Sequence, residues 1–274
     1  MKVSLIQMNS IADKAGNIAQ ATDLIEAAVR DERPDWVLLP ETFDWAGGSR
    51  EDKQNAAEVI PGGPAYTAMQ ALAKKHGIFI HAGSLLEKVE GEPRLYNTTL
   101  VFNRSGEEIA RYRKIHLFDV TTPDGSGYKE SHAIAPGEAV VTYDCEGVTI
   151  GCAICYDLRF ADLFLALAEK GADMIALPAA FTLMTGKDHW EVLCRARAIE
   201  TETYFCAAAQ TGTFQVGNET RATYGHSLVV DPWGHVVAKA SDGIGVVSTR
   251  IDKKRINKVR EMIPVAQHRK ALRG

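Results

Sequence analysis

Short apolar runs alternate with amphipathic helical patterns along most of the chain, and this alternation restricts the fold more than any other feature. The runs at 3–8, 36–39 and 148–154 have the length of buried strands, and apolar residues recur at helical spacing between 18 and 28. Such a pattern predicts α/β layers. Periodicity alone leaves open whether one doubly wound sheet forms or two sheets pack face to face. Because no linker-like or low-complexity segment divides the 274 residues, we expect a single domain over 1–274.

Turn and cap residues give the expected ends of several elements. Pro178 is expected to end the strand that begins at Met174, and a long helix is expected over His189–Thr203. Thr121–Tyr128, which is rich in Gly, Pro and Thr, and Phe214–Arg221 are predicted as loops.

Charge and cysteine content exclude several classes of partner. A net charge of −4 without a polybasic cluster argues against nucleic acid and anionic membranes as partners. No apolar stretch reaches the roughly 20 residues of a membrane helix, and the first eight residues are typical of a strand rather than a signal peptide. Five cysteines, an odd number at irregular spacing, indicate reduced thiols and a cytoplasmic location.

Cys155 follows the apolar run 148–154, and a helical pattern starts soon after it, so it is predicted at a strand-to-helix turn. A nucleophile at such a turn stands at the sheet edge, where backbone N–H groups are free to hold an oxyanion. Position alone does not distinguish it from a buried structural cysteine such as Cys194.

Cys152 and Cys155 also form a C-x-x-C pair, which raises redox and metal alternatives. A redox pair usually has its first cysteine at the turn, whereas Cys152 falls inside the predicted strand. A zinc site needs two more ligands, and the sequence has no second C-x-x-C or close Cys/His pair. Both hypotheses are therefore less favoured than a nucleophile.

Glu41 and Lys114 supply what a cysteine nucleophile needs. Glu41 directly follows a buried strand ended by Pro40, at the sheet edge where α/β sites gather. Lys114 lies in a basic patch that enters an apolar run. A free thiol has a pKa of about 8.5 and is only slightly ionised at neutral pH. Glu41 would take its proton and later activate water, while Lys114 and the Tyr156 backbone N–H would stabilise a tetrahedral oxyanion.

Three segments resemble those that carry the Glu, Lys and Cys of the nitrilase superfamily of carbon–nitrogen hydrolases: LPETF at 39–43, YRKIHL at 112–117 and GCAICYDLRF at 151–160. The resemblance runs essentially end to end. It implies a four-layer α-β-β-α sandwich and a homodimer or larger homo-oligomer formed through helices beside the cysteine. It also implies a second glutamate after the lysine. Glu130 matches that position, where it would orient Lys114 and the substrate.

Other segments, at 185–201, 224–234 and 263–269, resemble the Nit branch of amidases. Within that branch, the run RARAIE at 195–200 is more similar to the deaminated-glutathione amidases than to the ω-amidases. Both kinds of enzyme cleave amides of 2-oxo dicarboxylic acids, so the resemblance implies a small amide substrate that carries a carboxylate.

Five residues near Cys155 are candidate substrate contacts. Arg159 could clamp a carboxylate through both guanidinium nitrogens, or instead form a salt bridge with Asp157 or Asp162. His116 is interpreted as a structural neighbour of Lys114 rather than the base of a Cys–His dyad. The remaining candidates, which would form pocket walls, are Tyr156, Phe181, Thr182 and Thr185.

Two rival functions use the same residues differently. A nitrilase would act on organic nitriles through the same Glu, Lys and Cys. The predicted loops at 121–128 and 214–221, which depart from the deaminated-glutathione pattern and could border the pocket, keep that alternative open. A non-catalytic binding protein would have kept the fold only as a scaffold, but all four site residues are present. No metal or organic cofactor is implied, because thiol and carboxylate supply the chemistry.

Overall fold

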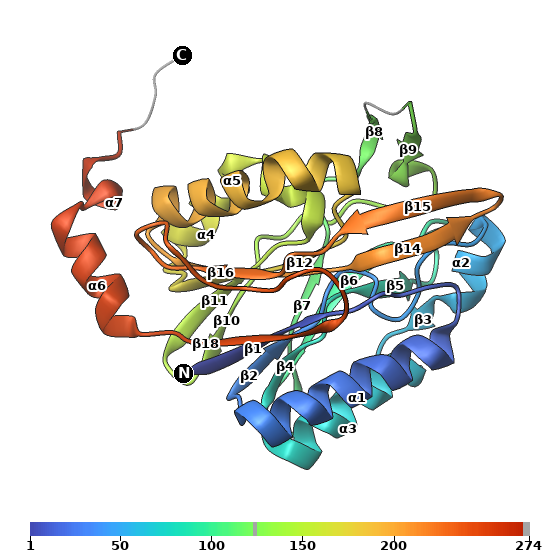
Figure 1. The fold of residues 1–274 in the computed structure, drawn as a ribbon, viewed down its shortest axis with the longest axis horizontal. Helices are drawn as coiled ribbons and strands as arrows, with labels where there is room; N and C mark the ends of the chain where they lie inside the picture. The colour runs from blue at the N-terminus through green and yellow to red at the C-terminus, as the bar shows by residue number, and fades with distance from the viewer. Residues whose placement is uncertain (123–124, 271–274) are drawn as a thin grey trace.

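The computed structural model describes residues 1–122 and 125–270, and its strands form two large sheets (Figure 1). The first is eight-stranded, in the order β18-β1-β2-β4-β6-β5-β3 with β7 paired to β6. Its strands are β1 (Lys2–Gln7), β2 (Trp36–Leu38), β3 (Glu58–Val59), β4 (Phe79–His81), β5 (Leu85–Lys88), β6 (Tyr96–Phe102), β7 (Glu108–Arg113) and β18 (Gly245–Arg250). The second has the order β10-β11-β12-β13-β16-β17. Its strands are β10 (Thr142–Cys145), β11 (Val148–Cys152), β12 (Met174–Ala179), β13 (Tyr204–Ala209), β16 (Leu228–Val230) and β17 (Val236–Lys239).

Helices cover the outer face of each sheet (Figure 1). On the first sheet lie α1 (Lys14–Glu32), capped by Asp13, and α3 (Pro64–His76), while α4 (Ala161–Glu169) and α5 (Leu183–Thr201) lie on the second. The order of layers is therefore α-β-β-α, as predicted. Near the chain end, α6 (Lys253–Met262) and α7 (Val265–His268) run along one side. Within the described residues, no helix is both long and apolar enough to cross a membrane.

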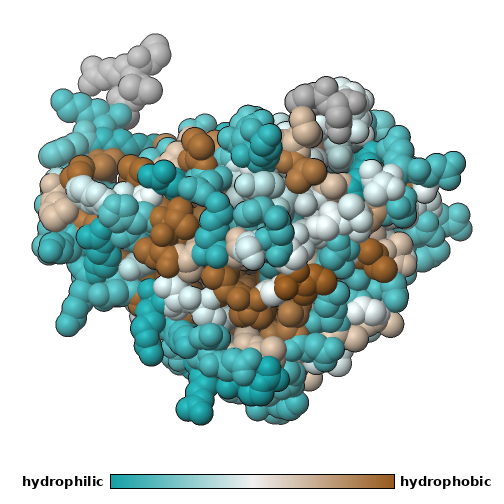
Figure 2. Space-filling model, in the orientation of Figure 1, coloured by the Kyte–Doolittle hydropathy of each residue, from teal (hydrophilic) through white to brown (hydrophobic). Residues whose placement is uncertain are grey.

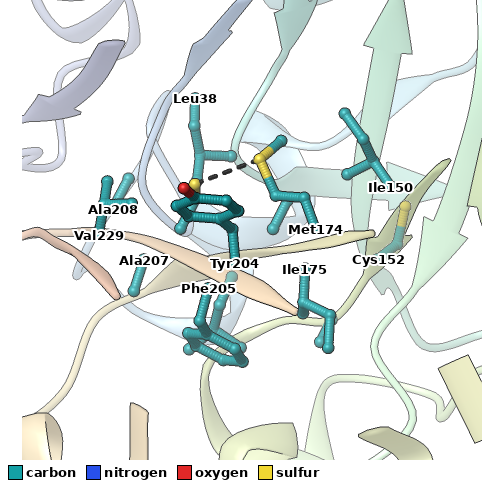
Figure 3. Packing of buried hydrophobic residues seen from close by; sticks show 14 of the residues in the cluster. Leu38, Ile150, Cys152, Met174, Ile175, Tyr204, Phe205, Ala207, Ala208 and Val229 are labelled. Carbon is teal, nitrogen blue, oxygen red and sulfur yellow. Dashed lines mark hydrogen bonds between the residues drawn. The ribbon is translucent and has the colours of Figure 1, made fainter. Parts of the chain in front are cut away.

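The main core lies between the two sheets. Leu38 of the first sheet and Met174 of the second point into this layer, and the Met174 sulfur accepts a 3.3 Å hydrogen bond from the Cys206 thiol (Figure 3). Side chains alternate along each strand, so the neighbouring Ile175 and Phe205 point to the opposite face. One cluster of buried residues spans both sheets. Across the surface seen in Figure 2, hydrophobic residues gather in the middle, between α5 and α1, and hydrophilic residues cover the rim.

A chain of three hydrogen-bonded polar side chains, Trp36, Tyr143 and His81, crosses this core. The indole Nε1 of Trp36 donates to the Tyr143 hydroxyl at 2.8 Å, and that hydroxyl lies 3.1 Å from His81 Nδ1. The other ring nitrogen, Nε2, is buried and has no hydrogen-bond partner among the described residues. Burial lowers the pKa of His81 from 6.5 to about 3, so the ring stays neutral in the folded protein.

We expect His81 to make the protein sensitive to acid. Below pH 6.5 the His81 imidazole binds a proton in the unfolded chain, whereas in the folded protein it stays neutral down to about pH 3. The free energy of unfolding therefore decreases as the pH falls through that window. His81→Asn keeps a polar group for Tyr143 but cannot titrate. The gap in unfolding free energy between wild type and variant should narrow by about 2 kcal/mol between pH 6.5 and 4.5, measured by urea unfolding. A gap independent of pH would show that the pKa of His81 is the same in the folded protein as in the unfolded chain.

Two predicted element ends were wrong. The helix expected over His189–Thr203 begins at Leu183, after the N-cap Thr182. Pro178 does not end its strand, because β12 continues to Ala179. In β12, the backbone groups of residues 176 and 178 point toward β11, which stops at Cys152, opposite Ala176. The missing N–H of Pro178 therefore faces a side with no neighbouring strand and breaks no ladder hydrogen bond.

Both predicted loops belong to β-hairpins. The segment at 121–128 belongs to the pair β8 (Asp119–Thr121) and β9 (Gly127–Lys129), although its positions 123 and 124 lie outside the described residues. The segment at 214–221 belongs to β14 (Thr211–Val216) and β15 (Glu219–Tyr224). The two hairpins and the short helix α2 (Arg50–Ala56) lie toward the same end of the molecule (Figure 1).

Candidate active site

A cavity of about 310 Å³ brings together residues that are far apart in the sequence. Glu41 follows β2, Lys114 follows β7, Glu130 begins the short 3₁₀ helix η1 (Glu130–His132), and Cys155 begins another, η2 (Cys155–Arg159). All four line the cavity. Its size is within the range of small-molecule sites.

Lys114 is held between the two glutamates. Its ammonium nitrogen lies 2.9 Å from Glu41 Oε1 and 2.9 Å from Glu130 Oε2. The Lys114 side chain is only 2% exposed and Glu41 only 6%. Burial lowers the pKa of Lys114, but the negative charges of Glu130 and Glu41 outweigh it and raise the pKa well above its ordinary value. Lys114 is therefore a permanent cation inside the cavity.

Asn97, on β6, is a site residue that the sequence did not reveal. Its amide Nδ2 donates to Glu41 Oε1 at 2.9 Å and, more weakly, to Glu130 Oε1 at 3.4 Å. The backbone carbonyl of Asn97 accepts a hydrogen bond from the backbone N–H of Lys114 at 2.9 Å. Asn97 thus fixes both carboxylates and the lysine backbone together. A lone Asn in a strand carries no pattern, and only the pairing of β6 with β7 places it beside Lys114.

Cys155 adopts a left-handed backbone, with φ of 47°, where β11 turns into η2. A positive φ at a residue other than glycine is a conformation that packing must enforce and that is common at functional sites. Burial, followed by the negative charge of Glu41, raises the pKa of the Cys155 thiol well above its ordinary value, and Lys114 offsets this only in part. The thiol is therefore neutral at rest.

Gly83 permits the approach that positions Glu41. Its φ is +48°, and a Cβ at this position would lie 2.0 Å from the carbonyl oxygen of Pro40. Since that contact is with backbone, no side chain larger than hydrogen fits there. The next residue, Ser84, accepts the N–H of Thr42 at 2.9 Å. The segment around Glu41 is therefore held by the turn after β4.

Asp157, buried two residues after Cys155, ties the cysteine turn to the lysine segment. Its carboxylate accepts hydrogen bonds from the Ile154 N–H at 2.8 Å and the Tyr112 hydroxyl at 2.6 Å. From His116 it accepts the backbone N–H at 3.0 Å, and its oxygen lies 2.7 Å from Nδ1 of that ring. His116 is thus bound to Asp157 and stacked on Phe160, in agreement with its interpretation as a structural neighbour.

We expect Asp157→Asn to destabilise the protein by about 2–4 kcal/mol, because a neutral amide cannot accept all the hydrogen bonds made to the carboxylate. Urea unfolding measures the effect. The matched control is Asp162→Asn, which makes the same change at an exposed residue in the first turn of α4 and should cost less than about 0.5 kcal/mol. Equal effects of the two substitutions would contradict a linking role for Asp157.

The predicted substrate contacts divide into two groups. Tyr156, Phe181, Thr182 and Thr185 line the cavity, and the two threonine hydroxyls lie 2.8 Å apart. Arg159 is not among the described residues that form the lining. Its guanidinium lies over the rings of Tyr156 and Phe181, at 6.0 and 5.5 Å from their centres, and both terminal nitrogens lie 3.3 Å from His189 Nδ1. Carboxylate binding by Arg159 stays a prediction.

The sequence matches a known family over nearly its whole length. The model of that family, described as carbon-nitrogen hydrolase, aligns with residues 2–261. The chain belongs to the carbon–nitrogen hydrolase family. This membership confirms the resemblance and identifies the chain as an enzyme.

Relatives of this carbon–nitrogen hydrolase include amidases. It is 40% identical over 268 residues to the deaminated glutathione amidase of Synechocystis sp. (strain PCC 6803 / GT-S), an alignment that covers 96% of each chain. With human omega-amidase NIT2 it shares 36% identity over 274 residues, covering 98% of this chain and 95% of that protein. The crystal structure of Saccharomyces cerevisiae Nit3, described as a member of branch 10 of the nitrilase superfamily, matches with a TM-score of 0.86 and 32% identity, over 97% of this chain and 94% of that one. These matches confirm the predicted fold.

Proposed function

We propose that this enzyme hydrolyses the amide bond of a small, carboxylate-bearing substrate through a thioester on Cys155. The observation that carries the proposal is the convergence of Glu41, Glu130 and the Lys114 ammonium beside the Cys155 thiol in one cavity. This arrangement offers a base, a fixed positive charge and a nucleophile within one small volume.

Acylation begins with a neutral thiol. Glu41 accepts the Cys155 proton as the sulfur attacks the amide carbonyl, so no thiolate has to accumulate in the buried site. Negative charge then develops on the carbonyl oxygen. The Lys114 ammonium and the backbone N–H of Tyr156 stabilise it. Collapse of this intermediate expels ammonia or an amine, which takes the proton from Glu41, and leaves the acyl group on sulfur.

Deacylation reverses these roles. Glu41, again ionised, removes a proton from water as the water attacks the thioester, and Lys114 again faces the developing oxyanion. Collapse of this second intermediate breaks the C–S bond, releases the acid and returns the proton from Glu41 to the Cys155 sulfur. Glu130 holds Lys114 from the other side, and its Oε2 also accepts the Phe118 N–H at 2.7 Å, which fixes the carboxylate. Glu130 therefore orients the lysine and helps position substrate. Thiol, carboxylate and ammonium supply every group that these steps use, so the proposal includes no cofactor.

Two substrate classes follow from the relatives: amides like deaminated glutathione, and ω-amides. Tyr156, Phe181, Thr182 and Thr185 are the proposed pocket walls, and Arg159 braces the two aromatic rings from behind. The amidase names of the relatives favour an amide over a nitrile.

A direct comparison of substrates tests this proposal. Wild-type enzyme is given a short ω-amide, a 2-oxo-glutaramyl peptide and the nitrile that matches the ω-amide, and the release of acid and of ammonia or amine is measured. We expect turnover of at least one amide and little of the nitrile. Faster nitrile turnover would contradict the amidase proposal.

We also propose that the enzyme acts in the cytoplasm as a homodimer or larger homo-oligomer. On α5, Val192 and Ile199 are seven residues apart, on the same helix face, and are 67% and 50% exposed. Apolar side chains on one helix face suit a contact with a second copy. Sedimentation equilibrium should give at least twice the 29.9 kDa mass of the chain, and a monomer would contradict this part of the proposal.

A further inference from the structure

The charge of the cavity differs in sign from that of the whole chain. Among the described residues that line it, four are basic and two are acidic, which gives a net charge of +2, whereas the chain carries −4. Lys114 is paired with both Glu41 and Glu130, and these three residues together carry a charge of −1. The excess positive charge therefore comes from the other three cations, which are Lys53, Lys129 and Arg221.

Lys53, on α2, is a half-buried cation without an acidic partner. Its ammonium makes no hydrogen bond or ion pair within the part of the chain that the structure describes, although its side chain lines the cavity. Burial lowers the pKa of Lys53, the charge of Glu130 raises it, and that of Arg221 lowers it further. Lys53, Glu130 and Arg221 line the same cavity. A partly desolvated ammonium in this position favours an anion beside it.

Arg221, on β15, points a second cation into the same region. Its Nε is buried and has no hydrogen-bond partner among the described residues. One terminal nitrogen reaches the Gly127 carbonyl at 3.4 Å and the Glu219 carboxylate at 3.2 Å. Glu219 is 68% exposed, so solvent weakens its neutralising effect. The guanidinium also lies over the Tyr128 ring at 4.3 Å, which holds it in place.

We propose that Lys53 and Arg221 form an anion subsite that binds a carboxylate of the amide substrate. The subsite rests on the proposed function and deepens it, because it assigns the substrate charge to α2 and the β14–β15 hairpin rather than to Arg159. A guanidinium and an ammonium on one carboxylate supply charge-assisted hydrogen bonds. The preferred substrates are then amides with a free carboxylate, and neutral amides of the same shape bind more weakly.

A matched substrate pair tests the subsite. One substrate is the monoamide of a five-carbon dicarboxylic acid, and the other carries a methyl ketone in place of the carboxylate. For Lys53→Met and Arg221→Met, we expect KM for the carboxylate substrate to rise at least about tenfold relative to KM for the ketone. Lys53→Arg, which keeps the charge, should retain the preference. Lys74→Met, the same change at an exposed residue of α3 outside the cavity, should leave both KM values unaltered.

Binding of glutarate, measured by calorimetry, tests the subsite independently of turnover. Weaker binding to Lys53→Met and Arg221→Met than to wild type supports it, even if the enzyme cleaves neither amide and the proposed amidase function fails. Equal losses for the carboxylate and ketone substrates, or glutarate binding unchanged in both variants, would overturn the subsite and leave the amidase proposal standing.

Discussion

Cys155→Ala should abolish amide turnover, with a loss on the order of 10⁵- to 10⁶-fold in kcat, because loss of the nucleophile removes both chemical steps. Wild-type enzyme mixed with a slowly hydrolysed amide should show a covalent acyl adduct by intact-protein mass spectrometry, and the variant should show none. Cys155 is buried, and alanine differs from cysteine only by the absence of the sulfur atom, so the substitution leaves no large cavity.

Cys152→Ala is the matched control for this experiment. Cys152 lies three residues earlier, fully buried at the end of β11 in the core between the sheets. We expect the Cys152 variant to retain activity and to form the adduct. If both substitutions abolished turnover equally, or if a Cys152–Cys155 disulfide formed under mild oxidation, the redox hypothesis for the C-x-x-C pair would replace the nucleophile.

Much of the fold and of the catalytic cluster could be predicted from the sequence. Strand ends have local signals, since Pro40 and the apolar run before Cys155 mark the sheet edge where Glu41 and Cys155 lie. Each of these residues can therefore be located from its own neighbours in the chain. That Glu41, Lys114 and Cys155 share one site could not be derived this way and follows from the family resemblance.

The parts that were missed depend on contacts distant in sequence. Asn97 and Asp157 are recognisable only when β6, β7 and the cysteine turn are placed side by side, because each acts through hydrogen bonds to other segments. Gly, Pro and Thr in the segment 121–128 and polar residues in the segment 214–221 are typical of loops, so the sequence does not reveal that each segment belongs to a hairpin. Lys53 and Arg221 likewise gained significance only from the shared cavity.

Glu41→Gln should lower the pKa of Cys155 and, at the same time, lower kcat for amide hydrolysis. The negative charge of Glu41 raises the pKa of Cys155, so a neutral amide at position 41 should lower that pKa. Lys114 remains in place to favour the thiolate. Alkylation of Cys155 by iodoacetamide at pH 8–9, which requires thiolate, should therefore become faster in the variant.

Amide hydrolysis by the same variant should fall about 10³- to 10⁴-fold in kcat, because no group remains to take the thiol proton or to activate water. Glu130→Gln, the matched substitution on the other side of Lys114, leaves the base intact and should cost only about 10- to 100-fold. Parallel rates of alkylation and turnover across the three proteins would mean that catalysis starts from a preformed thiolate. Faster alkylation together with slower turnover in Glu41→Gln would instead require that the proton leave sulfur only as the carbonyl is attacked. A buried, neutral Cys155 requires this chemistry.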